Sequence, residues 1–515
     1  MNPIQEIQTL ADLPRTLSAD RGSNVALIMD GRKISFQELD TLSNRVANAL
    51  IGAGIVAGDR IAMLARDSFA SVAMLFGVAK ARAVLVNINW RLAADEIVYT
   101  LRDAAPLLLF VDEEFARLMP QIESRMAAPP QFAALAGWCE DASDSAPGLA
   151  YDPDDVVVQI YTSGTTGRPK GVRLRNQSFF AIAQEMEAAG DPWIAWRDSA
   201  VSLLFVPSFH IGGLWWLVRG LALGCVNIVL RSFDPRAILR VIPQYHVTKT
   251  CMVPSMIQVL LAEPGCSTTD FSSLETIVYG GSPISAALLE RAIKVFQCDF
   301  CQIYGMTETG NMAVCLRPED HHAADPTRLR AAGRPLPGVK VRILDSSRNV
   351  LGPGSMGEIA IQSPARMASY WNWPDATRNT LVDGWIMTGD AGYQDDEGFV
   401  FVCDRIKDMI ICAGENIYPA EIENVIRAHP GVADAAVIGV PDDFWGEAIK
   451  AVIVPQEKQT IAAADIIRHA RAHLAEFKIP KSVDFVQQLP RNATGKILKS
   501  KMRDPYWRGR DRRVN

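Results

Sequence analysis

The alternation of helical and strand patterns constrains the fold of this chain more than any other feature. Apolar residues follow helical spacing at 35–50 and 71–81, whereas 60–64 and 83–88 are short apolar runs typical of buried strands. The same rhythm recurs at 199–206, 226–230 and 276–279. A strand, a helix and a strand in sequence predict a parallel sheet with crossover helices.

The pattern changes beyond residue 340. Short strand-like runs, separated by Gly, Pro and Asp, occur at 339–344, 357–361 and 398–402. They predict a β-rich subdomain that follows the parallel-rich sheets.

A charged segment, DRIKD at 404–408, separates this region from a second compact unit. There, a helical pattern at 422–429 and strand patterns at 435–440 and 449–454 predict a small α+β domain. We therefore place the domain boundary at Lys407. The expected fold is α/β, with an N-terminal domain at 1–406 and a small C-terminal domain at 407–515.

Composition and charge narrow the classes of protein. The chain of 515 residues has 49% hydrophobic and 21% charged residues, a balance typical of a globular chain with more than one domain. Its formal net charge of −6 gives no basic surface for nucleic acid. We expect neither a signal peptide nor a transmembrane segment, because the N-terminus lacks an apolar core and the apolar runs are too short to cross a bilayer.

Nine cysteines are scattered along the chain. Cys298 and Cys301 form one CxxC, but no second pair at zinc spacing accompanies it. We interpret the cysteines as reduced thiols rather than as a metal or redox site, which points to a cytoplasmic location.

A run of small, hydroxyl-bearing residues and glycines, TSGTTGRPKG, follows the strand pattern at 156–161. Gly164 and Gly167 let the backbone approach a ligand closely, and Lys170 adds a positive charge. Backbone amides and hydroxyls can donate to phosphate oxygens from Thr162, Ser163, Thr165 and Thr166. The spacing differs from that of a Walker loop, so another kind of phosphate-binding loop is predicted.

Two further segments contain groups suited to a nucleotide. YGMTE at 304–308 offers a ring that can stack on adenine, a hydroxyl that can reach phosphate, and a carboxylate that can hold Mg²⁺ beside a triphosphate. GGSP at 280–283 follows a strand pattern, and its two glycines allow the backbone to line a flat ligand.

TSGTTGRPKG resembles the signature loop of the adenylate-forming superfamily, which includes acyl-CoA synthetases, luciferases and the adenylation domains of peptide synthetases. The resemblance extends in order along nearly the whole chain, from ISFQELDTLSNRVANAL to PRNATGKILK. It implies an enzyme that uses Mg²⁺ and ATP to activate a carboxylic acid as an acyl-adenylate.

The resemblance implies a role for each matching motif. YGMTE places Tyr304 at the adenine, Thr307 at the α-phosphate and Glu308 at the metal ion. TGD at 388–390 makes Asp390 the ribose ligand, with Arg405 near the same ribose and phosphate. The remaining residues implied to contact the nucleotide are Gly280, Gly281, Ser282, Pro283 and Gly305.

FHIGG at 209–213 resembles the aromatic segment at the mouth of the acyl pocket, and it implies that His210 lies near the carboxylate and acts as a gate. Of Trp215 and Trp216, we expect at least one to pack in the core and the other to form the pocket wall. Their bulk favours a short-chain, medium-chain or ring acid, while a long-chain acid that enters by a side tunnel stays open.

PRNATGK resembles the family's C-terminal catalytic segment and implies a catalytic role for Lys496. A carboxylate that attacks the α-phosphate brings two anionic groups together, and a cation between them stabilises the transition state. The resemblance implies that Lys407 is the hinge of a mobile C-terminal domain; many family members have Asp at this position, and Lys is a known variant. Gly414 is implied to line the channel for the pantetheine arm.

The implied enzyme is an AMP-forming acyl-CoA synthetase, whose cofactors are ATP, Mg²⁺ and coenzyme A and whose substrate is a fatty, alicyclic or aromatic acid. We expect these small molecules as its partners, with a homodimer as the assembly to test. Three alternatives stay open: a stand-alone enzyme that loads a carrier protein, a luciferase-like oxidation, and a non-catalytic nucleotide-binding member. The joint presence of Lys170, Glu308, Asp390 and Lys496 argues against the last.

Overall fold

A computed structural model describes residues 7–508 except 163–167, 192–195, 198, 323–326, 413–414, 443–444, 458, 460 and 492–496. The chain divides into two compact units, Met1–Val341 with Ile361–Met387, and Arg342–Ala360 with Thr388–Asn515. The fold is mixed α/β, as the sequence predicts. Because such a division reports packing and not motion, the boundary and hinge at Lys407 stay a prediction.

In the first unit, one mixed sheet runs in the order β15-β14-β13-β12-β11-β9-β10-β1-β2. Neighbouring strands from β13 to β1 are parallel, whereas β2, β14 and β15 pair antiparallel. The strands are β1 (Val25–Met29), β2 (Arg32–Ser35), β9 (Val201–Leu204), β10 (Val226–Val229), β11 (Lys249–Met252), β12 (Thr276–Gly280), β13 (Asp299–Tyr304), β14 (Val314–Leu316) and β15 (Arg334–Pro335). The predicted strands at 199–206, 226–230 and 276–279 are confirmed.

A second sheet of this unit runs in the order β18-β8-β7-β4-β3-β5-β6. The path from β6 to β7 is parallel, whereas β8 pairs antiparallel with both β7 and β18. The strands are β3 (Arg60–Leu64), β4 (Val84–Asn87), β5 (Leu108–Val111), β6 (Gln131–Ala134), β7 (Val156–Thr162), β8 (Lys170–Arg175) and β18 (Ser369–Tyr370).

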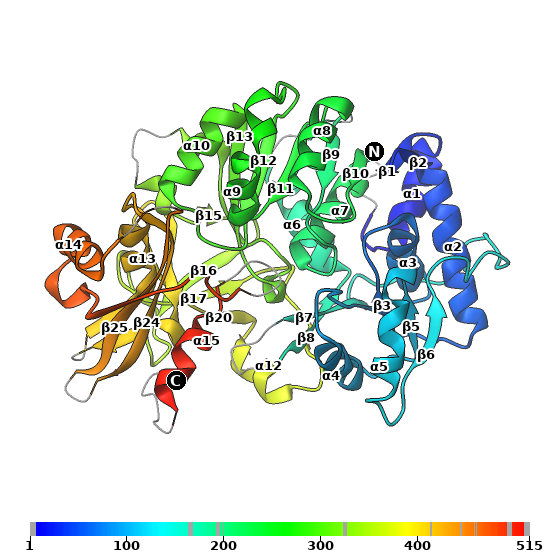
Figure 1. Ribbon diagram of the computed structural model, residues 1–515. Helices are drawn as coiled ribbons and strands as arrows, with labels where there is room; N and C mark the ends of the chain where they lie inside the picture. Colours follow the sequence, from blue (N-terminus) through cyan, green and yellow to red (C-terminus); the bar gives the residue numbers. More distant parts are fainter. Residues whose placement is uncertain are drawn as a thin grey trace. The chain divides into compact units, whose positions relative to one another are not determined.

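Helices connect the parallel strands, as the alternating pattern predicts, and Figure 1 shows α8, α9 and α10 beside the strands from β9 to β13. The helices are α1 (Asp12–Arg21), α2 (Phe36–Gly52), α3 (Phe69–Lys80), α4 (Ala94–Ala104), α5 (Met119–Glu123), α6 (Gln177–Ala188), α7 (Ile211–Ala222), α8 (Pro235–Tyr245), α9 (Pro254–Ala262), α10 (Ala286–Phe296), α11 (Pro318–His321) and α12 (Pro374–Thr380). None of the helices that the structure describes is long and apolar enough to cross a membrane.

A capping box starts α2. The Glu38 amide donates to the Ser35 hydroxyl at 3.1 Å, and the Ser35 amide donates to the Glu38 carboxylate at 2.6 Å. Leu39, Val46 and Leu50 are buried on one face, as helical spacing requires, and the helix packs against α3. Local signals in the sequence therefore account for both the start and the orientation of this helix.

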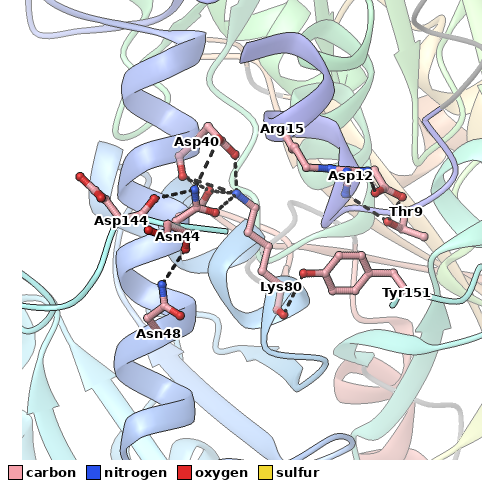
Figure 2. A network of polar contacts seen from close by, with 11 residues as sticks. Thr9, Asp12, Arg15, Asp40, Asn44, Asn48, Lys80, Asp144 and Tyr151 are labelled. Atoms are coloured by element: carbon pink, nitrogen blue, oxygen red, sulfur yellow. Dashed lines mark hydrogen bonds and ion pairs between the residues drawn. The ribbon is translucent and has the colours of Figure 1, made fainter. Parts of the chain in front are cut away.

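A buried lysine joins α2 and α3 to the connection that leads into β7 (Figure 2). Lys80 is only 2% exposed, and its ammonium donates to Asp40 Oδ1 at 2.5 Å and to Asn44 Oδ1 at 2.6 Å. The Asn44 amide in turn donates to the Asp144 carbonyl at 2.9 Å, and the Tyr151 hydroxyl donates to the Lys80 carbonyl at 3.2 Å. The network fixes the segment that precedes the phosphate-loop strand.

The predicted β-rich subdomain corresponds to a sheet in the order β16-β17-β20-β19, to which β21 is added through β20. Its strands are β16 (Lys340–Leu344), β17 (Gly357–Gln362), β19 (Leu381–Val382), β20 (Trp385–Gln394) and β21 (Val400–Arg405). By residue number, β16, β17 and β20 contain residues of both units.

The C-terminal part of the second unit is a small α+β assembly with its own apolar core. A sheet in the order β23-β22-β25-β24, with β26 added to β25, packs around buried side chains that include Ile410, Ile422, Ile426 and Ile449. Its elements are β22 (Ile410–Cys412), β23 (Glu415–Ile417), α13 (Pro419–Arg427), β24 (Val432–Asp442), β25 (Gly446–Pro455), α14 (Ala463–His473), β26 (Ser482–Phe485) and α15 (Lys499–Arg503).

Candidate active site

The predicted phosphate loop connects β7 and β8, which form an antiparallel hairpin in the register Thr162↔Lys170. Lys170 is buried, and its ammonium lies 5.1 Å from the centre of the Tyr370 ring and 6.0 Å from that of Trp373. Thr162 ends β7. The predicted residues between the strands, Ser163, Gly164, Thr165, Thr166 and Gly167, lie outside the described residues.

Glu308 lies in a 3₁₀ turn, η4 (Thr307–Thr309), directly after β13 and Gly305. Its carboxylate is buried, and the Tyr370 hydroxyl donates to Glu308 Oε1 at 2.6 Å. Since the Lys170 ammonium lies against the ring of the same tyrosine, one side chain connects the lysine of the phosphate hairpin with the carboxylate expected at the metal ion. The structure thus brings together two site residues that are far apart in sequence.

The donor set fits Mg²⁺ only together with a nucleotide. Within the part of the chain that the structure describes, no group of three or more His, Cys, Asp or Glu side chains could hold a metal ion. A Mg²⁺ ion in enzymes of nucleoside triphosphates is commonly bound by one or two carboxylates together with substrate phosphates. Glu308 can supply such a carboxylate, and the phosphates would supply the other oxygens.

The adenine segment and the YGMTE segment lie side by side at the carboxyl edge of the first sheet. Gly280 ends β12 in parallel register with Ile303 of β13, next to Tyr304. A Cβ atom at Gly280 would lie 2.4 Å from the Ile303 carbonyl oxygen, so only glycine allows this close approach. Gly281 has a φ of +79°, which favours glycine as well. Ser282 and Pro283 follow in the same turn.

His210 is the N-cap residue of α7, and its ring lies 4.4 Å from that of Phe209. Its Nε2 atom is buried and has no hydrogen-bond partner among the described residues. Burial and, to a smaller extent, the charge of Arg91 lower the pKa of His210 to about 3. The imidazole is therefore neutral near pH 7, so it can exchange a hydrogen bond with a substrate but supplies no positive charge.

Asn311, which lies beside the first turn of α7, is a residue that the sequence analysis missed. A Cβ atom at Gly212, in the first turn of α7, would lie 3.8 Å from Asn311 Oδ1. Asn311 has a φ of +93°, and its buried Nδ2 finds no partner in the described part of the chain. The signal in the sequence is the Gly310-Asn311 pair, because Gly and Asn tolerate left-handed backbone best.

Both tryptophans of α7 are buried. The Trp216 ring packs against that of Trp196 with 5.2 Å between ring centres, so Trp216 belongs to the core, as expected for at least one of the pair. A role for Trp215 in the pocket wall stays a prediction.

In the second unit, Asp390 and Arg405 face each other on β20 and β21. The Arg405 Nε atom lies 2.8 Å from Asp390 Oδ1, and Arg405 Nη1 donates to the Thr388 carbonyl at 3.0 Å. Asp390 is buried, and its amide donates to the Thr388 hydroxyl at 3.0 Å. The structure therefore places together the two residues that the sequence assigns to the ribose.

Lys407 lies directly after β21 in a 3₁₀ turn, η6 (Ile406–Asp408). Burial lowers the pKa of its ammonium. The guanidinium of Arg503, from α15, donates to Asp408 Oδ1 at 3.0 Å and to the Lys407 carbonyl at 3.4 Å. The predicted pantetheine residue Gly414 and the predicted catalytic residue Lys496 lie outside the described residues.

Two exposed aromatic rings of the second unit also escaped the sequence analysis. Trp445 is 40% exposed and Phe477 is 51% exposed. The Lys481 ammonium lies 4.6 Å from the Trp445 ring centre, and the Lys478 ammonium lies 5.5 Å from that of Phe477. Flat faces next to cations suit a base and its phosphates, although the motifs themselves carry no such signal.

The structure pairs Cys301 of the CxxC with Cys315 rather than with Cys298. Cys301 is buried, and its sulfur lies 3.1 Å from that of Cys315 on the neighbouring strand. All nine cysteines are free thiols, and burial raises the pKa of Cys298 to about 12.

Known protein families and curated proteins match this chain over most of its length. The model of the AMP-binding enzyme family matches residues 15–371, and that of the AMP-binding enzyme C-terminal domain matches residues 421–496. A fatty acid–[acyl-carrier-protein] ligase of Streptomyces coeruleorubidus is 44% identical over 99% of both chains. A feruloyl-CoA synthase of an Amycolatopsis species is 37% identical over 92% of this chain and 94% of its own.

Solved structures agree with the sequence comparisons. ATP-bound MatB from Rhodopseudomonas palustris superimposes with a TM-score of 0.88 at 29% identity, over 97% of this chain and 99% of its own. The o-succinylbenzoate CoA synthetase of Bacillus subtilis, with its acyl-adenylate bound, gives a TM-score of 0.85 at 30% identity, over 95% and 97% of the two chains. The chain belongs to the AMP-binding enzyme family, the adenylate-forming superfamily, and is an AMP-forming acid–thiol ligase.

Proposed function

We propose that the enzyme is an acyl-CoA synthetase that acts on a fatty, alicyclic or aromatic acid. The observation that carries the proposal is the contact of both Lys170 and Glu308 with Tyr370. It joins a cation suited to the triphosphate and a carboxylate suited to its metal ion. The predicted adenine segment, Gly280 and Gly281, lies beside the end of β13, the strand that precedes Glu308.

In the first half-reaction, a carboxylate oxygen of the acid bonds to the α-phosphorus of ATP, the bond from that phosphorus to the bridging oxygen breaks, and pyrophosphate leaves. Lys170 and Thr307 bind phosphate oxygens, and Glu308 with those oxygens would hold Mg²⁺, which neutralises the charge of the triphosphate. Lys496 supplies the cation between the carboxylate and the α-phosphate. Neutral His210 lies beside the acid.

In the second half-reaction, the thiol sulfur bonds to the acyl carbon of the mixed anhydride, the bond from that carbon to the phosphate oxygen breaks, and AMP leaves while the thiol loses its proton. Asp390 and Arg405 hold the ribose of the adenylate. Because the two half-reactions need different groups at one centre, we propose that the small domain turns about Lys407 between them and that Gly414 then lines the path of the pantetheine arm.

The thiol acceptor is the main alternative. The relative at 44% identity is named for an acyl-carrier-protein, so a carrier protein is the second candidate. Coenzyme A is favoured by the exposed rings of Trp445 and Phe477 and by Lys481 beside Trp445, because its adenosine 3′,5′-diphosphate offers a base and phosphates. The Lys478 ammonium beside Phe477 is paired with Glu421 at 2.7 Å. Stacking of one base on an aromatic ring contributes about 1–3 kcal/mol.

The test has two stages. Exchange of pyrophosphate into ATP across a panel of fatty, alicyclic and aromatic acids identifies the acid, and a panel with no active acid would refute the first half-reaction. Thioester formation with free coenzyme A is then compared with that on a pantetheinylated carrier protein.

A variant separates the acceptors further. Trp445→Ala should raise the KM for coenzyme A about tenfold and leave pyrophosphate exchange unchanged. Phe485→Ala, which removes another exposed ring of this unit, is the matched control. An unaltered KM for coenzyme A in Trp445→Ala, together with efficient acylation of the carrier, would favour the carrier-loading function.

A further inference from the structure

Ser208, two residues before His210, is held by buried groups of the neighbouring sheet. The Ser208 amide donates to Asp67 Oδ2 at 3.2 Å, and its hydroxyl donates to Asp67 Oδ1. The side-chain amide of Asn87 donates to the Ser208 hydroxyl at 3.3 Å. All three side chains are buried, and hydrogen bonds in such surroundings are stronger than in water.

The topology explains why these residues meet. Asn87 ends β4, next to the end of β3 in the parallel register Met63↔Asn87, and Asp67 lies in the turn from β3 to α3. Ser208 follows β9 of the other sheet. The carboxyl edges of the two parallel-rich sheets of the first unit therefore meet at the segment that leads to His210.

The neighbours of Ser208 leave this segment little freedom. The Phe209 ring meets the Trp90 ring edge-on, with 5.9 Å between their centres, and the Arg91 guanidinium lies 5.7 Å from the centre of the Phe209 ring. A Cβ atom at Gly213 would lie 2.3 Å from the Val206 carbonyl oxygen, so the first turn of α7 lies tightly against the segment.

We infer that Asp67 is a positioning residue: its buried carboxylate holds Ser208 and so fixes Phe209 and His210 where the acid binds. The inference rests on the proposed function, because that function places His210 beside the acid. Asp67 acts through Ser208 and not on the reacting atoms. Its loss should therefore affect the acid and spare ATP.

The titration of Asp67 provides a distinctive readout. The pKa of Asp67 is raised to about 6. Burial is the largest cause, and it outweighs the opposite effects of the hydrogen bonds from Ser208 and of the charge of Arg231. Protonation replaces charge-assisted hydrogen bonds with weaker neutral ones. The hold on Ser208 should therefore weaken as the pH falls through about 6.

The acidic and basic side chains around Asp67 are held in ion pairs with one another. Arg231 is paired with Asp112 and Glu114 at 2.9 Å each, and Glu114 is also paired with Arg66 at 2.9 Å. Burial alone would raise the pKa of Glu114, but its hydrogen bonds and ion pairs with Arg66 and Arg231 together outweigh burial and lower this pKa, so that the carboxylate stays ionised. The pKa of His210 is lowered to about 3, which keeps that ring neutral.

The experiment measures pyrophosphate exchange against pH for the full chain. Asp67→Asn keeps the size of the side chain and one acceptor but cannot ionise. In the wild type, the KM for the acid should rise about tenfold as the pH falls through about 6, whereas the variant should show no such rise. Ser208→Ala removes a bond that favours the ionised form and should move the rise to higher pH. Asp155→Asn, which loses a pair with Arg82 at 3.1 Å, is the matched control.

Hydrogen exchange of the peptide 205–214 tests the same hold without catalysis. After correction for intrinsic exchange, protection should fall below about pH 6 in the wild type and stay constant in Asp67→Asn. Equal profiles in the two proteins, or equal rises in the KM for acid and for ATP at every pH, would overturn the inference. Failure of every acid in the wild type, with the exchange profiles as expected, would overturn the proposed function instead.

Discussion

Replacement of Lys80 by methionine should destabilise the first unit strongly. Lys80 is 2% exposed, and its ammonium donates to Asp40 at 2.5 Å, to Asn44 at 2.6 Å and to the Ser43 hydroxyl at 2.8 Å. Removal of one partner of a buried ion pair costs about 3–5 kcal/mol, because the other charge stays buried without compensation. Lys80→Met leaves the Asp40 carboxylate without its cation; because the Asp40 side chain is 18% exposed, we expect a loss at the lower end of this range, about 3 kcal/mol.

Native-state hydrogen exchange suits this prediction, because it reports the opening free energy of each segment separately. In Lys80→Met, exchange of the protected amides of α2 should be about two orders of magnitude faster, which corresponds to a loss of about 3 kcal/mol. Arg15→Gln is the control, since its pair with Asp12 at 2.7 Å also belongs to this region (Figure 2) but the arginine side chain is 62% exposed. Such an exposed pair contributes about 0.2–1 kcal/mol.

A double-mutant cycle with Asp40→Asn separates the ion pair from the packing of the lysine stem. If the unpaired carboxylate causes the loss, Lys80→Met combined with Asp40→Asn should be more stable than the sum of the single changes predicts, by about 1–3 kcal/mol. A Lys80→Met protein that exchanges no faster than Arg15→Gln would refute the reasoning.

Three further predictions concern the site. Lys496→Ala should slow adenylate formation about a hundredfold or more but spare thioester formation from supplied acyl-adenylate, and equal losses in both assays would contradict its role. Asp390→Ala should raise the KM for ATP about tenfold or more with an unchanged acid preference, because it removes charge-assisted bonds to the ribose; an unaltered KM would remove Asp390 from the site. Trp215→Ala should widen the range of acids accepted in pyrophosphate exchange, whereas Trp216→Ala should mainly lower the free energy of unfolding, by about 3–5 kcal/mol. An unaltered acid profile in both variants would assign both tryptophans to the core and contradict the pocket-wall role of Trp215.

The elements that sequence predicts best are those with local signals. The strand at 60–64 is observed as β3 (Arg60–Leu64), since a continuous apolar run is the expected pattern of a strand buried on both faces. The helix after Ser35 begins where the capping box places it. Both signals lie within a few residues of the element that they determine.

The contacts of the site are mostly invisible to such reasoning, because they join distant parts of the chain. The hydrogen bond from Tyr370 to Glu308 spans 62 residues, and that from Ser208 to Asp67 spans 141. Neither Tyr370 nor Asp67 stands in a motif that the sequence analysis used. Motifs identify residues by their own chemistry, whereas these two are defined by what the sheet topology places next to them.

The pair of Asp390 and Arg405 shows how a neighbouring side chain changes the charge that a motif residue presents to a ligand. TGD alone suggests a carboxylate free to accept from the ribose, but Arg405 lies 2.8 Å from it. A carboxylate without a cation beside it would repel a nucleotide phosphate by its charge. Arg405 counters this repulsion. The predicted ribose ligand is therefore better understood as an ion pair than as a single aspartate, and the loss in Asp390→Ala includes the cost of an arginine left without this partner.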